Sequence, residues 1–309
     1  MKIKNDTTVL TALAFLLLLP LNSNCSNQMN ESNEINAIIS NVTPITNIPY
    51  KNIDSTSLYL DIYFPSKKLG QDPWFESTNG LKPLIINFHG GGWIEGTRQE
   101  SLLNLLPYMK KKFIVVNVDY RLLPKTDLKG SLSDCISAIN WVTKNLSQYN
   151  LKYNKIILTG DSAGGHLALL AGTINQDGMD LLGIEDKKLF KTDAIINWYG
   201  ITDVPKAIHF WNDSEYENIL LKNVSLDIEQ YFELLSPIIY VDKNTPSIIS
   251  IHGDADINVP ISQSIKLHEK LEGYSLKNKL ITISGKKHGG FSIEELDKVY
   301  KNIWKFLGS

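Results

Sequence analysis

The chain has 309 residues, of which 43% are hydrophobic and 21% are charged, and its formal net charge is −2. A nearly neutral chain argues against a nucleic-acid-binding protein, because such proteins carry clustered positive charge. The hydrophobic fraction is that of an ordinary globular protein and excludes wholesale disorder. The two cysteines, Cys25 and Cys135, are too few for a disulfide scaffold or a four-thiolate zinc site.

Residues 1–25 have the features of an export signal. Lys2 and Lys4 give a positively charged start, and an apolar run follows over Val9–Leu19. This run is shorter than the roughly 20 residues that a membrane-spanning helix requires, so it indicates a signal peptide. A buried N-terminal helix is the alternative, but the polar stretch after residue 25 favours export.

Cys25 ends the segment Leu21-Asn22-Ser23-Asn24-Cys25, which resembles a bacterial lipoprotein cleavage site with Asn24 where Gly, Ala or Ser is usual. We therefore expect an exported protein, either anchored to a membrane through a lipid on Cys25 or released as a periplasmic or secreted protein. Residues 26–48 are polar and predict a tether. A single folded domain is predicted over residues 49–309.

Strand and helix patterns alternate along this domain. Leu58–Phe64 alternates apolar and polar residues, as a half-buried antiparallel strand does. Continuous apolar runs predict buried strands at Pro83–Phe88, Phe113–Val118, Ile156–Leu158, Ala194–Trp198, Ser247–Ile251 and Leu280–Ile283. Helical periodicity covers Leu132–Leu146, Ala163–Ile174, Ile261–Leu271 and Ile293–Phe306. The pattern predicts an α/β fold, a mostly parallel sheet with helices on both faces.

Two further features belong to this pattern. The segment from about 205 to 235 interrupts the alternation and predicts a small insertion that could cap a site. Cys135 shares a helical spacing with apolar neighbours at Leu132, Ile136 and Ile139, so we interpret it as a core residue and not as a nucleophile.

Gly160-Asp161-Ser162-Ala163-Gly164-Gly165 lies between a predicted strand and a predicted helix. Gly160-x-Ser162-x-Gly164 is the pattern of a sharp strand-to-helix turn that lifts a nucleophilic serine above the sheet. The glycines are needed because the backbone is strained there and side chains would collide with the adjacent turns. The helix N-terminus that follows can stabilise negative charge near the serine.

A second glycine motif, His89-Gly90-Gly91-Gly92-Trp93, follows an upstream strand. Glycines at this position let backbone N–H groups approach a developing oxyanion. We predict Gly91 and Gly92 as donors, with Ala163 as the third. The spacing of a phosphate-binding loop is not met. We interpret His89 as a structural residue that orients the loop.

An acid and a base are expected downstream of the serine, in that order. Asp256 follows the strand over Ser247–Ile251, and Asp254 is the competing acid, which could instead brace the turn. His288, in Gly285-Lys286-Lys287-His288-Gly289-Gly290-Phe291, is the expected general base. His166, which follows the serine, has no comparable motif and is interpreted as a polar structural residue.

Together these motifs resemble the α/β-hydrolase superfamily, and within it the esterase/lipase group that includes hormone-sensitive-lipase-like and bacterial feruloyl and acetyl-xylan (BD-FAE-like) carboxylesterases. The resemblance covers roughly residues 50–309 and implies a carboxylesterase-like serine hydrolase. It implies Ser162 as nucleophile, His288 as base and Asp256 as the orienting acid. It implies no cofactor or metal, and a small-molecule ester, of small to medium acyl or aryl type, as the partner. The matching segments are the three motifs above, Val118-Asp119-Tyr120-Arg121-Leu122, Tyr199-Gly200-Ile201-Thr202-Asp203, Ser236-Pro237-Ile238 and His252-Gly253-Asp254-Ala255-Asp256.

Supporting and substrate-contacting residues follow from the same motifs. Asp119 and Arg121 are expected to support the site, with Arg121 bracing its floor through an ion pair. Aromatic side chains at strand ends, Trp93, Trp198 and Tyr199, are expected at the substrate pocket. An amidase, formamidase or peptidase of the same fold is the alternative enzyme, and a surface binding protein on a hydrolase scaffold is the non-enzyme alternative.

Overall fold

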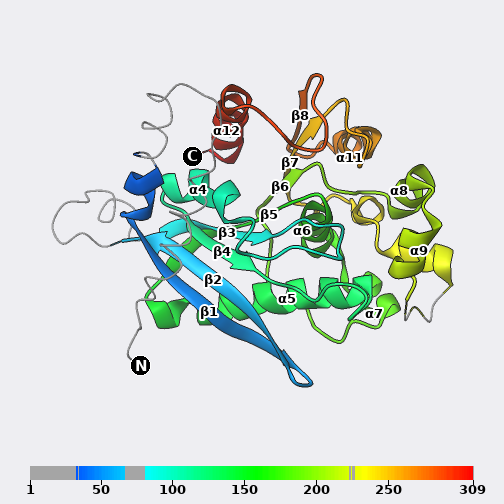
Figure 1. Ribbon diagram of the computed structural model, residues 1–309, viewed down its shortest axis with the longest axis horizontal. Helices are drawn as coiled ribbons and strands as arrows, with labels where there is room; N and C mark the ends of the chain where they lie inside the picture. The colour runs from blue at the N-terminus through cyan, green and yellow to red at the C-terminus, as the bar shows by residue number, and fades with distance from the viewer. Residues whose placement is uncertain (1–32, 34, 67–80, 223, 225–226, 309) are drawn as a thin grey trace.

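The computed structural model describes residues 33, 35–66, 81–222, 224 and 227–308. Its centre is an eight-stranded sheet with the order β1-β2-β4-β3-β5-β6-β7-β8 (Figure 1). The strands are β1 Val42–Ile53, β2 Thr56–Pro65, β3 Leu81–Phe88, β4 Ile114–Val118, β5 Lys152–Asp161, β6 Ala194–Trp198, β7 Ser247–Gly253 and β8 Asn278–Ile283. β1 and β2 pair antiparallel with their neighbours, and the other strands are parallel to one another. The predicted α/β fold with a mostly parallel sheet is confirmed.

The helices follow the predicted pattern and add several short elements. The 3-10 helices are η1 Leu102–Leu105, η2 Leu146–Tyr149 and η3 Pro237–Tyr240. The α-helices are α4 Leu106–Lys110, α5 Leu128–Asn145, α6 Ala163–Thr173, α7 Gln176–Leu182, α8 Val204–Trp211, α9 Ser214–Leu220, α10 Ile228–Leu234, α11 Ser262–Gly273 and α12 Ile293–Leu307. The insertion over 205–235 thus contains α8, α9 and α10. No helix in the described ranges combines the length and the apolar character needed to cross a membrane.

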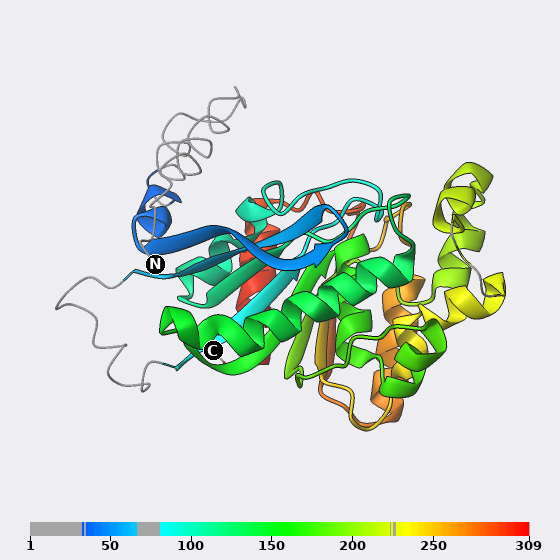
Figure 2. The same ribbon diagram turned by 90° about the horizontal axis from the view of Figure 1, so that it is seen from below.

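Helices cover both faces of the sheet. Successive residues of a strand point to opposite sides, so they belong to different cores. In β3, Leu84 and Ile86 belong to a core under α5, α6 and α11, whereas Ile85 belongs to a second core under α4 and α12. Cys135 is wholly buried in the first core, where the helical spacing placed it. Figure 2 shows α5 running along one face of the sheet, with α12 beyond the opposite face.

The folded domain begins earlier than the sequence pattern indicated. β1 starts at Val42, so residues 42–48 belong to the sheet and not to the tether predicted over 26–48. The strand was missed because its residues do not alternate in type and because its pairing with β2 shifts register twice. Residues 1–25 of the predicted signal, including Cys25, lie outside the described residues.

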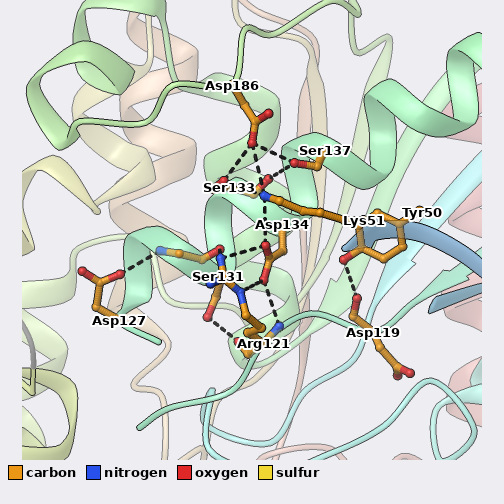
Figure 3. A network of polar contacts seen from close by, with 11 residues as sticks. Tyr50, Lys51, Asp119, Arg121, Asp127, Ser131, Ser133, Asp134, Ser137 and Asp186 are labelled. Carbon is orange, nitrogen blue, oxygen red and sulfur yellow. Dashed lines mark hydrogen bonds and ion pairs between the residues drawn. The ribbon is translucent and has the colours of Figure 1, made fainter. Parts of the chain in front are cut away.

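A network of charged side chains fastens β1 to α5 (Figure 3). Lys51 of β1 lies 3.1 Å from Asp134 of α5 and 3.3 Å from Asp186, which follows α7. Asp134 has no exposed surface and also accepts hydrogen bonds from the Arg121 guanidinium at 2.7 and 3.0 Å. Ser133 and Ser137 donate to Asp186. A buried carboxylate is tolerated at Asp134 because two cations neutralise it.

Candidate active site

Ser162 lies on the turn between β5 and α6 with φ 53 and ψ −118, a conformation that L-residues rarely adopt. The flanking glycines are there because nothing larger fits. A Cβ on Gly160 would lie 2.4 Å from the Gly164 carbonyl group, and one on Gly164 would lie 2.0 Å from the Phe88 carbonyl oxygen. The turn therefore presses α6 against the end of β3, which places Ser162 beside the loop that follows β3.

Three side chains from separate loops form one hydrogen-bonded chain. Ser162 Oγ lies 2.8 Å from His288 Nε2, and His288 Nδ1 lies 2.7 Å from Asp256 Oδ2. Because the carboxylate only accepts, the proton belongs on Nδ1, and Nε2 is then the acceptor for the Ser162 hydroxyl proton. Ser162, Asp256 and His288, selected from sequence motifs, are thus brought together at bonding distance.

Asp256 is held ionised by several donors. The N–H groups of Asn258 and Val259 donate to its Oδ1 at 2.8 and 2.9 Å. Burial opposes ionisation of this carboxyl, but the hydrogen bonds from His252, His288 and Val259 outweigh it and hold its pKa well below the usual range. A carboxylate that stays charged can keep His288 in one tautomer and stabilise its cationic form.

His252 is a partner of Asp256 that the sequence motifs did not identify. It has no exposed surface, and its Nε2 lies 2.8 Å from the Val259 carbonyl oxygen and 3.3 Å from Asp256 Oδ2. Since a carbonyl only accepts, Nε2 carries the proton, and Nδ1 accepts from Ser264 at 2.7 Å. His252 therefore fixes the turn that carries Asp256.

The first two peptide groups of the glycine loop after β3 are fixed by side chains. Tyr120 donates to the His89 carbonyl at 2.8 Å, and the Gly90 N–H donates to Asp161 at 3.1 Å. His89 Nδ1 donates to the Gly90 carbonyl at 2.7 Å and so orients the peptide group that carries the Gly91 N–H. His89 also stacks on Tyr120, with ring centroids 4.4 Å apart. It contacts the loop as the structural interpretation expected.

The next two peptide groups are held in turn. The Gly91 carbonyl accepts from the N–H groups of Ile94 and Glu95 at 3.1 and 3.0 Å, which orients the Gly92 N–H. The Gly92 carbonyl accepts from Tyr216 at 2.7 Å. Ala163, the third predicted donor, is buried at the first position of α6, where an N–H has no intrahelical acceptor. Preorganised N–H groups of this kind are what an oxyanion site requires.

Asp119, which was expected to support the site, pairs with Arg98 and not with Arg121. Arg98 is 4% exposed and pairs with Asp119 and, at 3.0 Å, with Asp61. Arg121 forms the predicted type of contact, an ion pair, but with Asp134 of α5 (Figure 3), and it does not line the cavity at Ser162. Arg121 thus forms the expected ion pair and joins the segment after β4 to α5, whereas Asp119 binds the N–H and the guanidinium of Arg98.

Ser162 and His288 open into a cavity of about 710 Å³. Its wall includes Tyr199, whose ring lies 4.6 Å from that of His288, and Phe210 and Trp211 from α8. Trp93, which was expected at the pocket, is among the residues that line this cavity. It has almost no exposed surface, and its ring packs against those of His166 and Trp211.

Trp198 was also expected at the substrate pocket. It lines a separate cavity of about 270 Å³, on the other side of Tyr199, together with Phe291 and Tyr300. Tyr199 follows β6 directly and lines both cavities. Of Trp198 and Tyr199, it is therefore Tyr199 that forms part of the wall of the cavity at Ser162.

The remaining polar residues have structural partners. Asp254, the competing acid, accepts from the Gly285 N–H at 2.5 Å and so braces the turn. His166 is wholly buried, and its Nε2 bonds the Leu235 carbonyl at 2.7 Å. Lys286 pairs with Glu295 at 3.1 Å. None of the three lines the cavity at Ser162.

A mostly parallel sheet, a serine on a strained turn after a central strand, and an acid and a histidine on later loops define the class of α/β-hydrolases. Within this class, the chain belongs to the BD-FAE family, whose model matches residues 60–271, well over half of the chain. The match contains Ser162 and Asp256 but ends before His288, so the contact of His288 with both comes from the structure.

Comparisons with individual proteins agree with this family. Isoprenylcysteine alpha-carbonyl methylesterase ICME of Arabidopsis thaliana is 28% identical over 251 residues, which are 76% of this chain and 55% of that protein. Esterase LipQ of Mycobacterium tuberculosis is 30% identical over 185 residues, 59% of this chain and 44% of that protein. The chain thus spans about half the length of the curated relatives it matches.

This chain matches a larger share of the solved structures that it resembles than of the curated relatives. A truncated carbohydrate esterase from gut microbiota is 26% identical, with a TM-score of 0.68 over 86% of this chain and 97% of the other. Esterase B from Lactobacillus rhamnosis HN001, at 20% identity, has a TM-score of 0.70 over 96% and 95% of the two chains. The second likeness concerns the fold alone.

Proposed function

We propose that the protein is a carboxylic-ester hydrolase that works through a covalent acyl-enzyme on Ser162. The observation that carries the proposal is the unbroken chain from Ser162 Oγ through His288 to Asp256, with contacts of 2.8 and 2.7 Å. A protein that only binds a ligand does not need Ser162, His288 and Asp256 at hydrogen-bonding distance from one another. The methylesterase and carbohydrate esterase among its relatives favour an ester as the substrate.

In the proposed reaction, His288 removes the Ser162 proton as Oγ attacks the ester carbonyl. The N–H groups of Gly91, Gly92 and Ala163 stabilise the oxyanion of the tetrahedral intermediate. Asp256 stabilises the His288 cation, which then protonates the departing alcohol. Water, activated by the same histidine, releases the acyl group from Ser162, so the reaction needs no cofactor.

The cavity supports substrates of small to medium size. Its aromatic wall, formed by Tyr199, Phe210 and Trp211, suits an acyl or aryl group. Glycines at 91 and 92 leave the approach to Ser162 open. We therefore propose short to medium acyl and aryl esters as the substrate class.

The experiment is hydrolysis of 4-nitrophenyl esters of increasing acyl length, beside the matching 4-nitroanilides, by the wild type and by Ser162→Ala. We expect ester hydrolysis that Ser162→Ala reduces by about 10³-fold or more. Ser284→Ala, a change at an exposed serine near the same edge of the sheet, is the control and should keep full activity. Activity that survives Ser162→Ala would exclude the mechanism, and faster anilide cleavage would make the protein an amidase.

We also propose that the protein is exported and anchored through a lipid on Cys25. This rests on the sequence of residues 1–25 alone. Radiolabelled palmitate should be incorporated in a bacterial host by the wild type and by Cys135→Ala, because Cys135 is buried. Cys25→Ala should lose the label, and equal labelling of Cys25→Ala would contradict the anchor.

A further inference from the structure

The insertion over 205–235 lines the cavity and also forms hydrogen bonds to two loops of the site. Helices α8 and α9 project beyond the end of the sheet (Figure 1), and they contact two loops of the site. Tyr216 of α9 donates to the Gly92 carbonyl at 2.7 Å. Trp211 of α8 donates through Nε1 to the Asn258 carbonyl at 2.5 Å. One bond reaches the glycine loop, and the other reaches the loop of the acid.

Both acceptors are adjacent to groups that the proposed reaction uses. The Gly92 carbonyl belongs to the last peptide group of the glycine loop, and Gly92 adopts φ 57, in the left-handed region. The Tyr216 oxygen lies directly over this residue, since a Cβ on Gly92 would be 3.0 Å from it. The Tyr216 hydroxyl therefore fixes the orientation of the peptide group between Gly92 and Trp93.

The second acceptor lies in the turn that binds Asp256. Asn258 uses its N–H to donate to Asp256 and its carbonyl to accept from Trp211. A shift of this peptide group would change the position of the carboxylate that orients His288. The insertion thus contacts the oxyanion side and the acid side of the site at once.

The two donors form one packed unit. The rings of Trp211 and Tyr216 meet edge to face with centroids 5.4 Å apart, and Trp211 also meets the buried ring of Trp93 at 6.3 Å. Burial raises the pKa of the Tyr216 hydroxyl, so it keeps the proton that it donates. Loss of either bond would loosen the contact made by the other.

We propose that Tyr216 and Trp211 are positioning residues for ester hydrolysis, which hold the glycine loop and the Asp256 turn in their active geometry while the insertion is docked. This inference rests on the proposed function. It predicts that the insertion sets the rate of the chemical step as well as the size of the cavity.

The test is Tyr216→Phe, which removes one oxygen atom and keeps the ring in the cavity wall. We expect kcat to fall about 3- to 10-fold, the value of one hydrogen bond, with KM within about twofold. The inhibition constant of an arylboronic acid, which forms a tetrahedral adduct on the serine, should rise by the same factor. Trp211→Phe should act in the same direction.

Tyr240→Phe is the matched control, because Tyr240 donates to the Leu234 carbonyl at the same 2.7 Å but contacts neither loop. It should lower the melting temperature about as much as Tyr216→Phe and leave kcat unchanged. Equal kcat values for Tyr216→Phe and Tyr240→Phe would overturn the proposal. In the double variant Tyr216→Phe/Trp211→Phe, a loss smaller than the product of the single losses is expected, and full multiplication would contradict a single docked unit.

Failure of the proposed function would look different. A wild type with no ester hydrolysis and no reaction of Ser162 with a fluorophosphonate would refute the function, and this inference with it. An active wild type whose kcat does not respond to Tyr216→Phe would overturn the inference alone.

Discussion

Gly164→Ala tests the steric account of the serine turn with a single methyl group. The added Cβ would lie 2.0 Å from the Phe88 carbonyl oxygen and 2.5 Å from that of His89. Both atoms are backbone, so no side chain can rotate away. Either α6 moves off the sheet or the end of β3 moves, and β3 leads directly into the glycine loop.

The size of the effect follows from these contacts. Ordinary Cβ contacts begin near 3.4 Å, so the backbone must separate by more than 1 Å. Forcing extra volume into a packed site costs about 1–3 kcal/mol, partly offset by the helix propensity of Ala, about 1 kcal/mol better than Gly. A displacement of about 1 Å in a catalytic site costs on the order of 100-fold in rate. We therefore expect a large loss of activity with a modest loss of stability.

Gly172→Ala provides the comparison within the same helix. There the new Cβ would meet the tip of the Ile195 side chain at 2.5 Å, and that side chain can adjust. The assay is kcat/KM on a 4-nitrophenyl ester together with urea unfolding of each variant. We expect Gly172→Ala to keep near wild-type activity and stability. Activity of Gly164→Ala within threefold of the wild type would refute the reasoning.

Three further predictions follow from charged groups. Asp256→Asn should lower kcat by about 10⁴-fold without unfolding the protein, because an amide does not stabilise the His288 cation; a loss below tenfold in steady-state assays would contradict this. Burial opposes ionisation of Asp186, but hydrogen bonds from neighbouring serines and a lysine outweigh it and lower its pKa, so its contribution to stability is present at neutral pH and is lost on acidification. Between about pH 5 and pH 3, the free energy of unfolding of Asp186→Asn should therefore decline less steeply than that of the wild type. The measurement is urea unfolding at each pH, and an equal decline in the two proteins would contradict the prediction. Arg121→Lys should cost about 1–3 kcal/mol in urea unfolding, because a lysine cannot reproduce both bonds to the buried Asp134; unchanged stability would show that one bond suffices.

The local motifs were enough to identify the residues at the centre of the site. Gly160-x-Ser162-x-Gly164 is readable because the strained turn excludes side chains at fixed offsets from the serine. Asp256 follows the buried strand β7, and His288 follows the partly exposed edge strand β8, which the sequence pattern had predicted to be buried. The carboxyl ends of parallel strands meet at one edge of a sheet. The strand over Ala194–Trp198 was predicted with its observed bounds because it is short, mostly apolar and almost wholly buried.

The supporting contacts depend on segments that are distant in the chain and have no pattern of their own. Arg98 pairs with Asp61 and Asp119, which belong to other elements. Trp198 and Tyr199 are adjacent in the sequence, yet Tyr199 lines the cavity at Ser162 and Trp198 does not. Tyr216 reaches the glycine loop from 124 residues away in the sequence. The sequence by itself identified the three residues of the hydrogen-bonded chain, because short-range sterics demand glycines at fixed offsets from Ser162 and because Asp256 and His288 follow strands of the sheet. Only the tertiary structure decided what holds those groups in place, because any donor of the right length could have filled that role.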